Sequence, residues 1–88
     1  MRIKDGFVLR DVASSTMVIA VGERSKTFKG MIKMNKTAKD IWLYIEQGLD
    51  TDQIVFNMSK KYNESEDKIK EDVLNIISIL LKNDIIEE

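Results

Sequence analysis

The chemistry open to this chain of 88 residues is limited first by the side chains that it lacks. It contains 14 Lys and Arg and 15 Asp and Glu, but no His and no Cys. Catalytic pairs of serine or cysteine with histidine are therefore excluded, as are thiolate metal sites and disulfides. No glycine-rich phosphate-binding motif is present either. We expect a protein that is not an enzyme and that needs no metal or cofactor.

The charged side chains are unevenly placed, although the net charge is only −1. From Asp40 onward acids outnumber bases, whereas the preceding stretch is purely basic. Two interpretations of the basic stretch stay open. Its lysines could lie on a solvated sheet face and discourage aggregation through the strand edge, or they could attract an acidic peptide. The basic residues concerned are Arg24, Lys26, Lys29, Lys33, Lys36 and Lys39.

A strand that turns directly into a helix is predicted in the middle of the chain. Residues 28–34 alternate with the period of a half-buried strand. Asn35 is a preferred N-cap residue, and apolar residues then recur at helical spacing. Because no partner strand follows, we expect 28–34 to lie at a sheet edge, where unpaired backbone groups can accept an extended peptide. One face of this strand would carry Phe28, Gly30, Ile32 and Met34, and the other Lys29, Met31 and Lys33.

The rest of the chain supplies two further strands and two further helices. Strands are predicted at 6–12 and 16–21, with a polar loop at 22–27, and short connections favour an antiparallel meander. Helices are predicted from Asn35 to about Gln47, from Asp50 or Thr51 to about Asn63, and from Ser65 to about Lys82. Ile85–Ile86 either adds a short strand or packs against the core. We expect an α+β, winged-helix-like fold: one domain, 1–88, in which a three-stranded antiparallel sheet precedes three helices.

The last predicted helix is apolar over about two-thirds of its circumference when projected at about 100° per residue. This is wider than one packed face requires. Either the helix is buried between two neighbours, or one flank lines a groove that a partner fills. The central stripe contains Ile69, Val73, Ile76 and Leu80. One flank carries Asp72, Ile76 and Ile79, and the other carries Lys70, Leu74 and Leu81. We favour the first flank for contacts with a partner. Separately, we expect Trp42 to lie in the core.

The order and spacing of several short motifs resemble those of the small PqqD-like proteins, also called RiPP recognition elements. RiPPs are ribosomally made, post-translationally modified peptides. The resemblance covers nearly the whole chain, although each motif is short. The matching features are Val8-Leu9-Arg10, the segment from Gly30 to Trp42, Asp52-Gln53-Ile54, Lys61-Tyr62-Asn63, Asp72-Val73-Leu74, Leu80-Leu81 and Ile85-Ile86.

The resemblance implies a non-catalytic adaptor. Family members bind the leader segment of a precursor peptide as a strand beside the third strand and third helix. They deliver it to a modifying enzyme, often a radical S-adenosylmethionine enzyme, or to a leader peptidase in lasso-peptide systems. Some relatives are fused to their enzyme, but this chain begins with Met and ends near its last predicted element, so we expect a free-standing protein. Carried onto this chain, the predicted peptide-binding residues are Phe28, Lys29, Gly30, Met31, Ile32, Lys33, Met34, Asp72, Ile76 and Ile79.

Other functions remain open at this point. A winged-helix relative could bind nucleic acid, but Glu66, Asp67, Glu71 and Asp72 at the start of the last helix would repel phosphates. An assembly factor for a folded protein partner is a further alternative, and the exposed edge could also pair two copies into a homodimer. The longest apolar runs are too short to span a membrane, and no secretory signal is visible. Because the chain also lacks cysteine, we expect a cytoplasmic protein.

Overall fold

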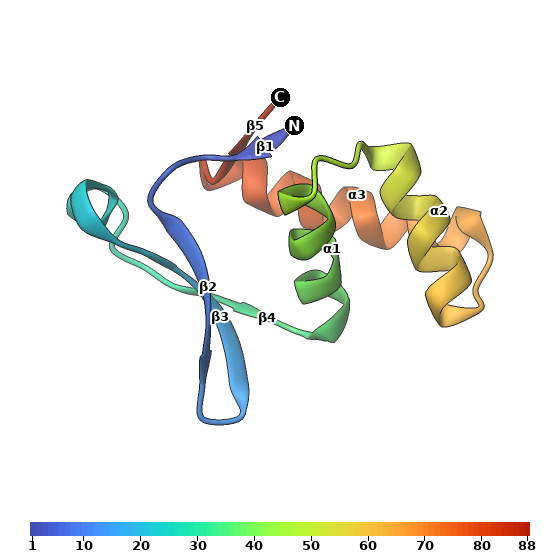
Figure 1. Cartoon of the computed structure of the whole chain (residues 1–88), viewed down its shortest axis with the longest axis horizontal. Helices are drawn as coiled ribbons and strands as arrows, with labels where there is room; N and C mark the ends of the chain where they lie inside the picture. Colours follow the sequence, from blue (N-terminus) through green and yellow to red (C-terminus); the bar gives the residue numbers. More distant parts are fainter.

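A computed structural model describes residues 1–88, and it places a twisted sheet at one side of three helices (Figure 1). The sheet has the order β2-β3-β4, and a separate two-stranded ladder joins β1 to β5. In chain order the elements are β1 (Arg2–Ile3), β2 (Phe7–Val12), β3 (Ser15–Ala20), the 3₁₀ helix η1 (Gly22–Lys26), β4 (Ile32–Met34), α1 (Lys36–Glu46), α2 (Thr51–Tyr62), α3 (Glu66–Lys82) and β5 (Ile86–Glu87). The predicted α+β fold, a three-stranded antiparallel sheet followed by three helices, is confirmed.

The sheet is an antiparallel meander, as its short connections predict. β2 and β3 pair along their whole length, with Val12 opposite Ser15 across a two-residue turn. β4 pairs with β3 through Ile32 opposite Val18 and Met34 opposite Thr16. Since β4 has no second neighbour, its other edge is open.

The predicted strand 28–34 is wrong in its first half, because only Ile32–Met34 pair with β3. The polar loop after β3 winds into η1, and the Phe28 N–H donates to the Arg24 carbonyl at 2.9 Å. The Phe28 ring then packs edge-on against Phe7 with centroids 5.1 Å apart. This contact holds Phe28 at the start of β2, so residues 29–31 serve as the return to the sheet.

The three helices begin and end where their capping residues predict. The Asn35 side chain accepts the N–H of Ala38, and Ser65 caps α3 in the same way. Asp50 rather than Thr51 caps α2, and it forms a reciprocal capping box with Gln53. Asn63 ends α2 with a φ of 52°, in the left-handed region that asparagine tolerates.

The two ends of the chain lie side by side (Figure 1). Arg2 lies opposite Glu87 and Ile3 opposite Ile86, while the Lys4 N–H donates to the Ile85 carbonyl at 2.8 Å. Of the two alternatives for Ile85–Ile86, a short strand forms at Ile86–Glu87, and both isoleucines are also buried in the core. The pairing of this strand with an N-terminal strand does not follow from the sequence. Two residues give no period-2 pattern from which a strand could be recognised.

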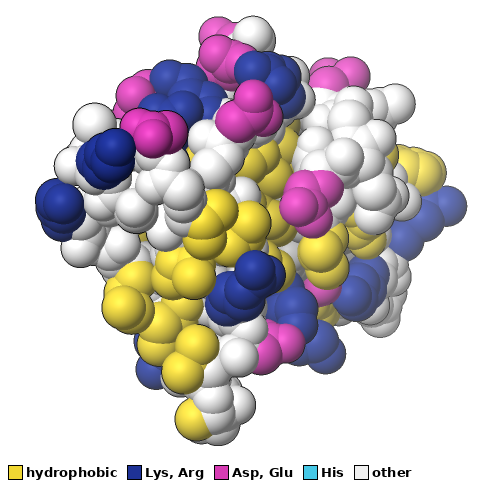
Figure 2. Space-filling view, turned by 60° about the vertical axis from the view of Figure 1, so that its left-hand side comes forward, with side chains coloured by type: hydrophobic (Ala, Val, Ile, Leu, Met, Phe, Trp, Pro, Cys, Tyr) yellow, Lys and Arg dark blue, Asp and Glu magenta, His cyan; other side chains and the backbone are white.

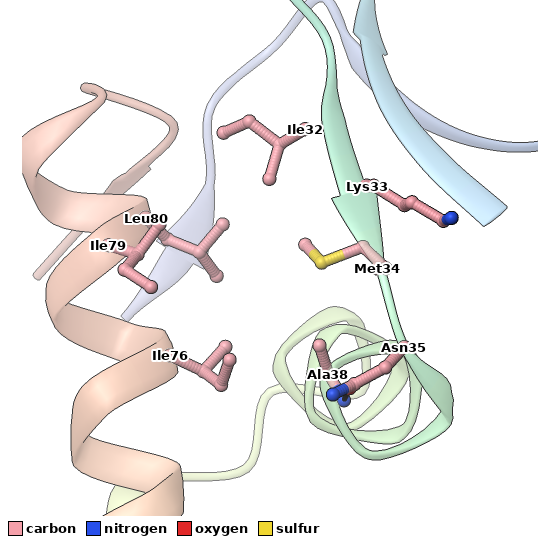
Figure 3. Close-up of a pocket in the computed structure, with 8 residues that line it drawn as sticks. All are labelled: Ile32, Lys33, Met34, Asn35, Ala38, Ile76, Ile79 and Leu80. Carbon is pink, nitrogen blue, oxygen red and sulfur yellow. Dashed lines mark hydrogen bonds between the residues drawn. The ribbon is translucent and has the colours of Figure 1, made fainter.

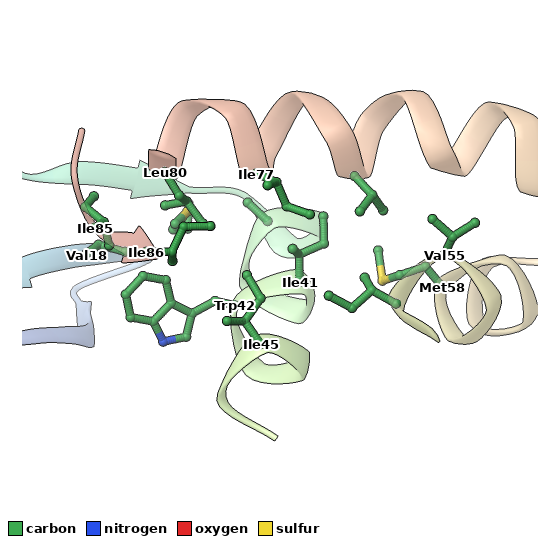
Figure 4. Packing of buried hydrophobic residues seen from close by; sticks show 14 of the residues in the cluster. Val18, Ile41, Trp42, Ile45, Val55, Met58, Ile77, Leu80, Ile85 and Ile86 are labelled. Carbon is green, nitrogen blue, oxygen red and sulfur yellow. The ribbon is translucent and has the colours of Figure 1, made fainter. Parts of the chain in front are cut away.

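The hydrophobic core lies between the sheet and the helices. Figure 4 shows Ile77 and Leu80 pointing from α3 toward Ile41 and Trp42 on α1. Trp42 has no exposed surface, as its predicted place in the core requires. No helix has the length and apolar composition needed to cross a bilayer.

Candidate functional site

An apolar cavity of about 260 Å³ opens between the edge strand β4 and the helix α3. Figure 3 shows Ile32 and Met34 pointing from β4 toward α3, and Ile76 pointing back from the helix. The start of α1 closes one end of the cavity. The lining residues are Ile32, Lys33, Met34, Asn35, Ala38, Ile76, Ile79 and Leu80.

The side-chain directions follow from the two periodicities of the elements. Alternation along β4 turns Ile32 and Met34 toward the helices and Lys33 away from them (Figure 3). On α3, Ile76 and Ile79 lie on the flank that faces β4, and Ile79 remains 39% exposed. The Ile76–Ile79 flank therefore faces the cavity, while the flank of Leu74 and Leu81 contributes no residue to it.

Five of the residues predicted for the site line this cavity, and five do not. Asp72 lines a different hollow, beside Thr37 and Tyr62. The four residues before β4 also lie outside the cavity, because the chain there is not extended along β3. Those four are Phe28, Lys29, Gly30 and Met31.

Three further residues line the cavity but were absent from the prediction. Asn35 and Ala38 occupy the strand-to-helix junction, where the sequence predicts only a cap and a helical position. Leu80 belongs to the central stripe of α3 and has no exposed surface, yet it forms part of the cavity wall. The tight turn from β4 into α1 is the signal that could have identified Asn35 and Ala38, because it brings the first turn of the helix beside the strand.

The direction of the backbone groups of β4 follows from the hairpin that precedes it. The Val21 N–H donates to the Gly6 carbonyl at 2.8 Å, so Val21 faces β2. Alternation then turns the backbone groups of Thr16 and Val18 toward β4, where they meet Met34 and Ile32. The N–H and C=O of Lys33 consequently point to the open edge of the sheet.

Several cations of the basic stretch are already engaged within the chain. Lys39 lies 3.7 Å from the Asp11 carboxylate, and Lys26 lies 3.2 Å from Glu23. The hydrogen bond from Thr16 and then the charge of Lys39 hold the pKa of Asp11 below its usual value. Arg24 lies over the Phe7 ring at 5.1 Å. Of the six cations of the basic stretch, Arg24, Lys29, Lys33 and Lys36 form no ion pair.

The surface around the site is more apolar than its lysines suggest. Figure 2, which brings the sheet side of the molecule forward, shows hydrophobic side chains gathered over the centre and the lower left. Charged side chains of both signs concentrate at the top, where Figure 1 places the two chain ends. Met31, 63% exposed, lies directly before the open strand. Such a surface suits an extended chain with apolar side chains.

The fold and this site define a class of protein: an antiparallel sheet followed by three helices, with an open edge strand beside the last helix. The family model of the coenzyme PQQ synthesis protein D (PqqD) matches residues 8–86. The chain therefore belongs to the PqqD family, in agreement with the resemblance of its motifs.

A solved structure supports the same fold. The chain described as "TbiB1 in Complex with the TbiA(beta) Leader Peptide" superimposes with a TM-score of 0.79 and 16% identity. The match covers 99% of this chain and 95% of that one. At this identity the likeness establishes the fold, and the bound leader peptide is a property of TbiB1. Comparison with curated proteins gives no match.

Proposed function

We propose that this protein is a non-catalytic adaptor that binds the leader segment of a ribosomally made precursor peptide and delivers it to a modifying enzyme or a leader peptidase. The observation that carries the proposal is the open edge of β4 beside an apolar cavity. Membership of the PqqD family supports it, as does the leader peptide bound to TbiB1, a protein of the same fold.

The proposed binding mode is addition of the leader as a strand to β4. The N–H and C=O of Lys33 point outward and would form the first ladder bonds, each contributing about 0.5–1.5 kcal/mol net. Because these bonds involve only backbone groups, they accept any sequence except proline at the paired position. Selectivity must come from the side chains of the leader.

Alternate side chains of an added strand would point toward α3 and enter the cavity. A cavity of about 260 Å³ exceeds the roughly 150 Å³ of an engineered apolar cavity that binds benzene. One large aliphatic or aromatic side chain would therefore fill it, against Ile76 and Ile79. Lys29, Lys33 and Lys36 would attract acidic residues elsewhere in the leader.

The interface would be small, because β4 has only three residues. An affinity in the micromolar to high-nanomolar range, about −8 to −9 kcal/mol, is expected. Weak binding suits delivery, since the peptide must leave the adaptor after modification. A radical S-adenosylmethionine enzyme and a leader peptidase are the partner classes that the family suggests.

A fluorescence-polarisation titration tests the proposal. The labelled probe is the leader half of a short precursor peptide encoded beside this protein, and a scrambled leader is the control. Saturable binding of the native leader alone, at micromolar affinity or better, is the expected result. Equal binding of both peptides, or binding of neither, would reject the adaptor function.

A further inference from the structure

The face of the sheet that points away from the helices is unusually apolar. Phe7, Leu9 and Val18 belong to or pack on the core, so the intervening residues of β2 and β3 face outward. In most antiparallel sheets the solvated face is polar. The outward-facing residues, here called the outer sheet face, are Val8, Arg10 and Val12 on β2, Ser15, Met17 and Ile19 on β3, and Lys33 on β4.

These residues form a continuous surface rather than scattered contacts. Val8 lies opposite Ile19, and Met17 lies between Arg10 and Lys33 as direct cross-strand neighbours. Val12 is 52% exposed, whereas Val8, Met17 and Ile19 are half-buried. None of Val8, Met17 and Ile19 packs against the hydrophobic core. Contiguous apolar surface of this kind typically marks a site where a partner binds.

The charge of the outer sheet face indicates which partner it suits. Its two charged residues are Arg10 and Lys33, and neither forms an ion pair within the chain. Asp11, the nearest acid in sequence, points to the helix side, where it contacts Lys39. A second copy would bring cations against cations, which disfavours self-association. A partner with an apolar surface bordered by acidic residues would be complementary to the outer sheet face.

We propose that the outer sheet face docks the enzyme to which the peptide is delivered, through an apolar patch on that enzyme bordered by Asp and Glu. The inference rests on the proposed function. It also explains how one small domain could hold a peptide and an enzyme together, because the outer sheet face shares only Lys33 with the cavity lining.

The position of the outer sheet face adds a geometric consequence. A leader added to β4 continues the sheet, and its side chains alternate between the two faces. Those pointing toward α3 fill the cavity, and the others extend the outer sheet face by one strand. The docked enzyme would therefore contact the leader directly, and leader binding should strengthen enzyme binding.

The test uses the intact protein and the purified modifying enzyme encoded beside the precursor gene. The variant Val8→Thr with Ile19→Thr makes the outer sheet face polar while keeping β-branched residues in both strands. The control is Leu74→Ser, because Leu74 is 47% exposed but lies on α3. We expect the double variant to bind the enzyme at least tenfold more weakly and to bind the leader with an unchanged Kd. The control should leave both constants unchanged.

The variant Arg10→Glu tests the role of charge separately. It should weaken enzyme binding, and the loss should be larger at low salt than at high salt. Unchanged enzyme affinity in the double variant, or no enzyme binding by the native protein, would overturn the inference. Dimerisation of the native protein that the double variant abolishes, or binding to phosphatidylglycerol vesicles that it abolishes, would also overturn it. The leader titration reports on the proposed function independently of all these outcomes.

Discussion

Tyr62 on α2 donates its phenolic hydrogen to the carboxylate of Asp40 on α1, and the Lys61 ammonium lies 3.0 Å from the same carboxylate. Burial opposes the ionisation of Asp40, but the bonds from Tyr62 and Lys61 outweigh it, so the pKa of Asp40 lies below its usual value. The hydrogen bond to Asp40 and, secondarily, burial raise the pKa of Tyr62 to about 12. The contact thus joins two helices through a pair that titrates at opposite ends of the pH scale.

This pair predicts an alkaline loss of stability. The folded pKa of Tyr62, about 12, exceeds the unfolded value of about 10. The stabilisation is therefore complete below pH 10 and is lost as the pH rises toward 12. Asp40 acts in the opposite sense, because its lowered pKa makes its contribution disappear as the pH falls through that value.

Urea unfolding followed by Trp42 fluorescence at pH 7 to 11.5 measures the alkaline effect. Tyr62→Phe should lower the free energy of unfolding by about 1.5 kcal/mol at pH 7. It should also make the fall in that free energy above pH 10 less steep. An equally steep decline in Tyr62→Phe would contradict the assignment.

Three glycines should respond differently to the same substitution by alanine. At Gly6, φ is 93° and an added Cβ would lie 2.5 Å from the Arg24 Cβ, so Gly6→Ala combines strain with a clash. A loss of at least about 2 kcal/mol is expected. Gly48 has a φ of 86° but open space around it, so Gly48→Ala should cost about 1 kcal/mol.

Gly30 has neither restriction, and Gly30→Ala should stabilise the fold by about 0.4–1 kcal/mol by restricting the unfolded chain. Chemical denaturation of the three variants in one buffer gives the order directly. A destabilised Gly30→Ala would show that residues 29–31 need the freedom of glycine.

The direction of the β4 backbone groups predicts opposite results for two neighbouring prolines. Lys33→Pro removes an outward N–H, so leader affinity should fall about tenfold while the fold is retained. Ile32→Pro removes an N–H that faces β3 and should destabilise the sheet itself. Lys33→Gln separates loss of charge from loss of the donor. Leader titrations and circular dichroism distinguish these effects, and full leader affinity in folded Lys33→Pro would exclude strand addition at β4.

The two flanks of α3 offer a matched pair of substitutions. Ile79 and Leu81 are each 39% exposed, but only Ile79 lines the cavity. Ile79→Ser should weaken leader binding by roughly tenfold, since it removes about 1.5 kcal/mol of apolar contact. Leu81→Ser should leave it unchanged, and both should have similar stabilities. Equal losses of affinity in the two variants would place the leader elsewhere.

The helices were predictable because their signals are local. Asn35, Asp50 and Ser65 each satisfy a backbone N–H within three residues, and apolar spacing then identifies the buried face. The core position of Trp42 follows from the same spacing. Sequence alone favours the flank of Ile76 and Ile79 but does not exclude the other, because the position of β4 beside α3 depends on the packing of the whole chain.

The errors in the prediction have tertiary causes. Residues 28–31 alternate as a strand should, but the packing of Phe28 on Phe7 diverts them from β3. The ladder between β1 and β5 joins residues at opposite ends of the chain, where two-residue strands carry no pattern. The predicted peptide-binding role of Asp72 stays a prediction, although the structure places this residue outside the cavity.

The ladder between β1 and β5 also has a mechanical consequence. Both chain ends leave the molecule at the same place, so a force applied between them opens the ladder one residue pair at a time, beginning with Arg2 and Glu87. Such a zipper resists load poorly compared with strands that are sheared past one another. Tension would next reach the segment before β2 and the last turn of α3, which carries Ile79 and Leu80. A load on the two termini is thus carried directly to a helical turn that forms one wall of the cavity.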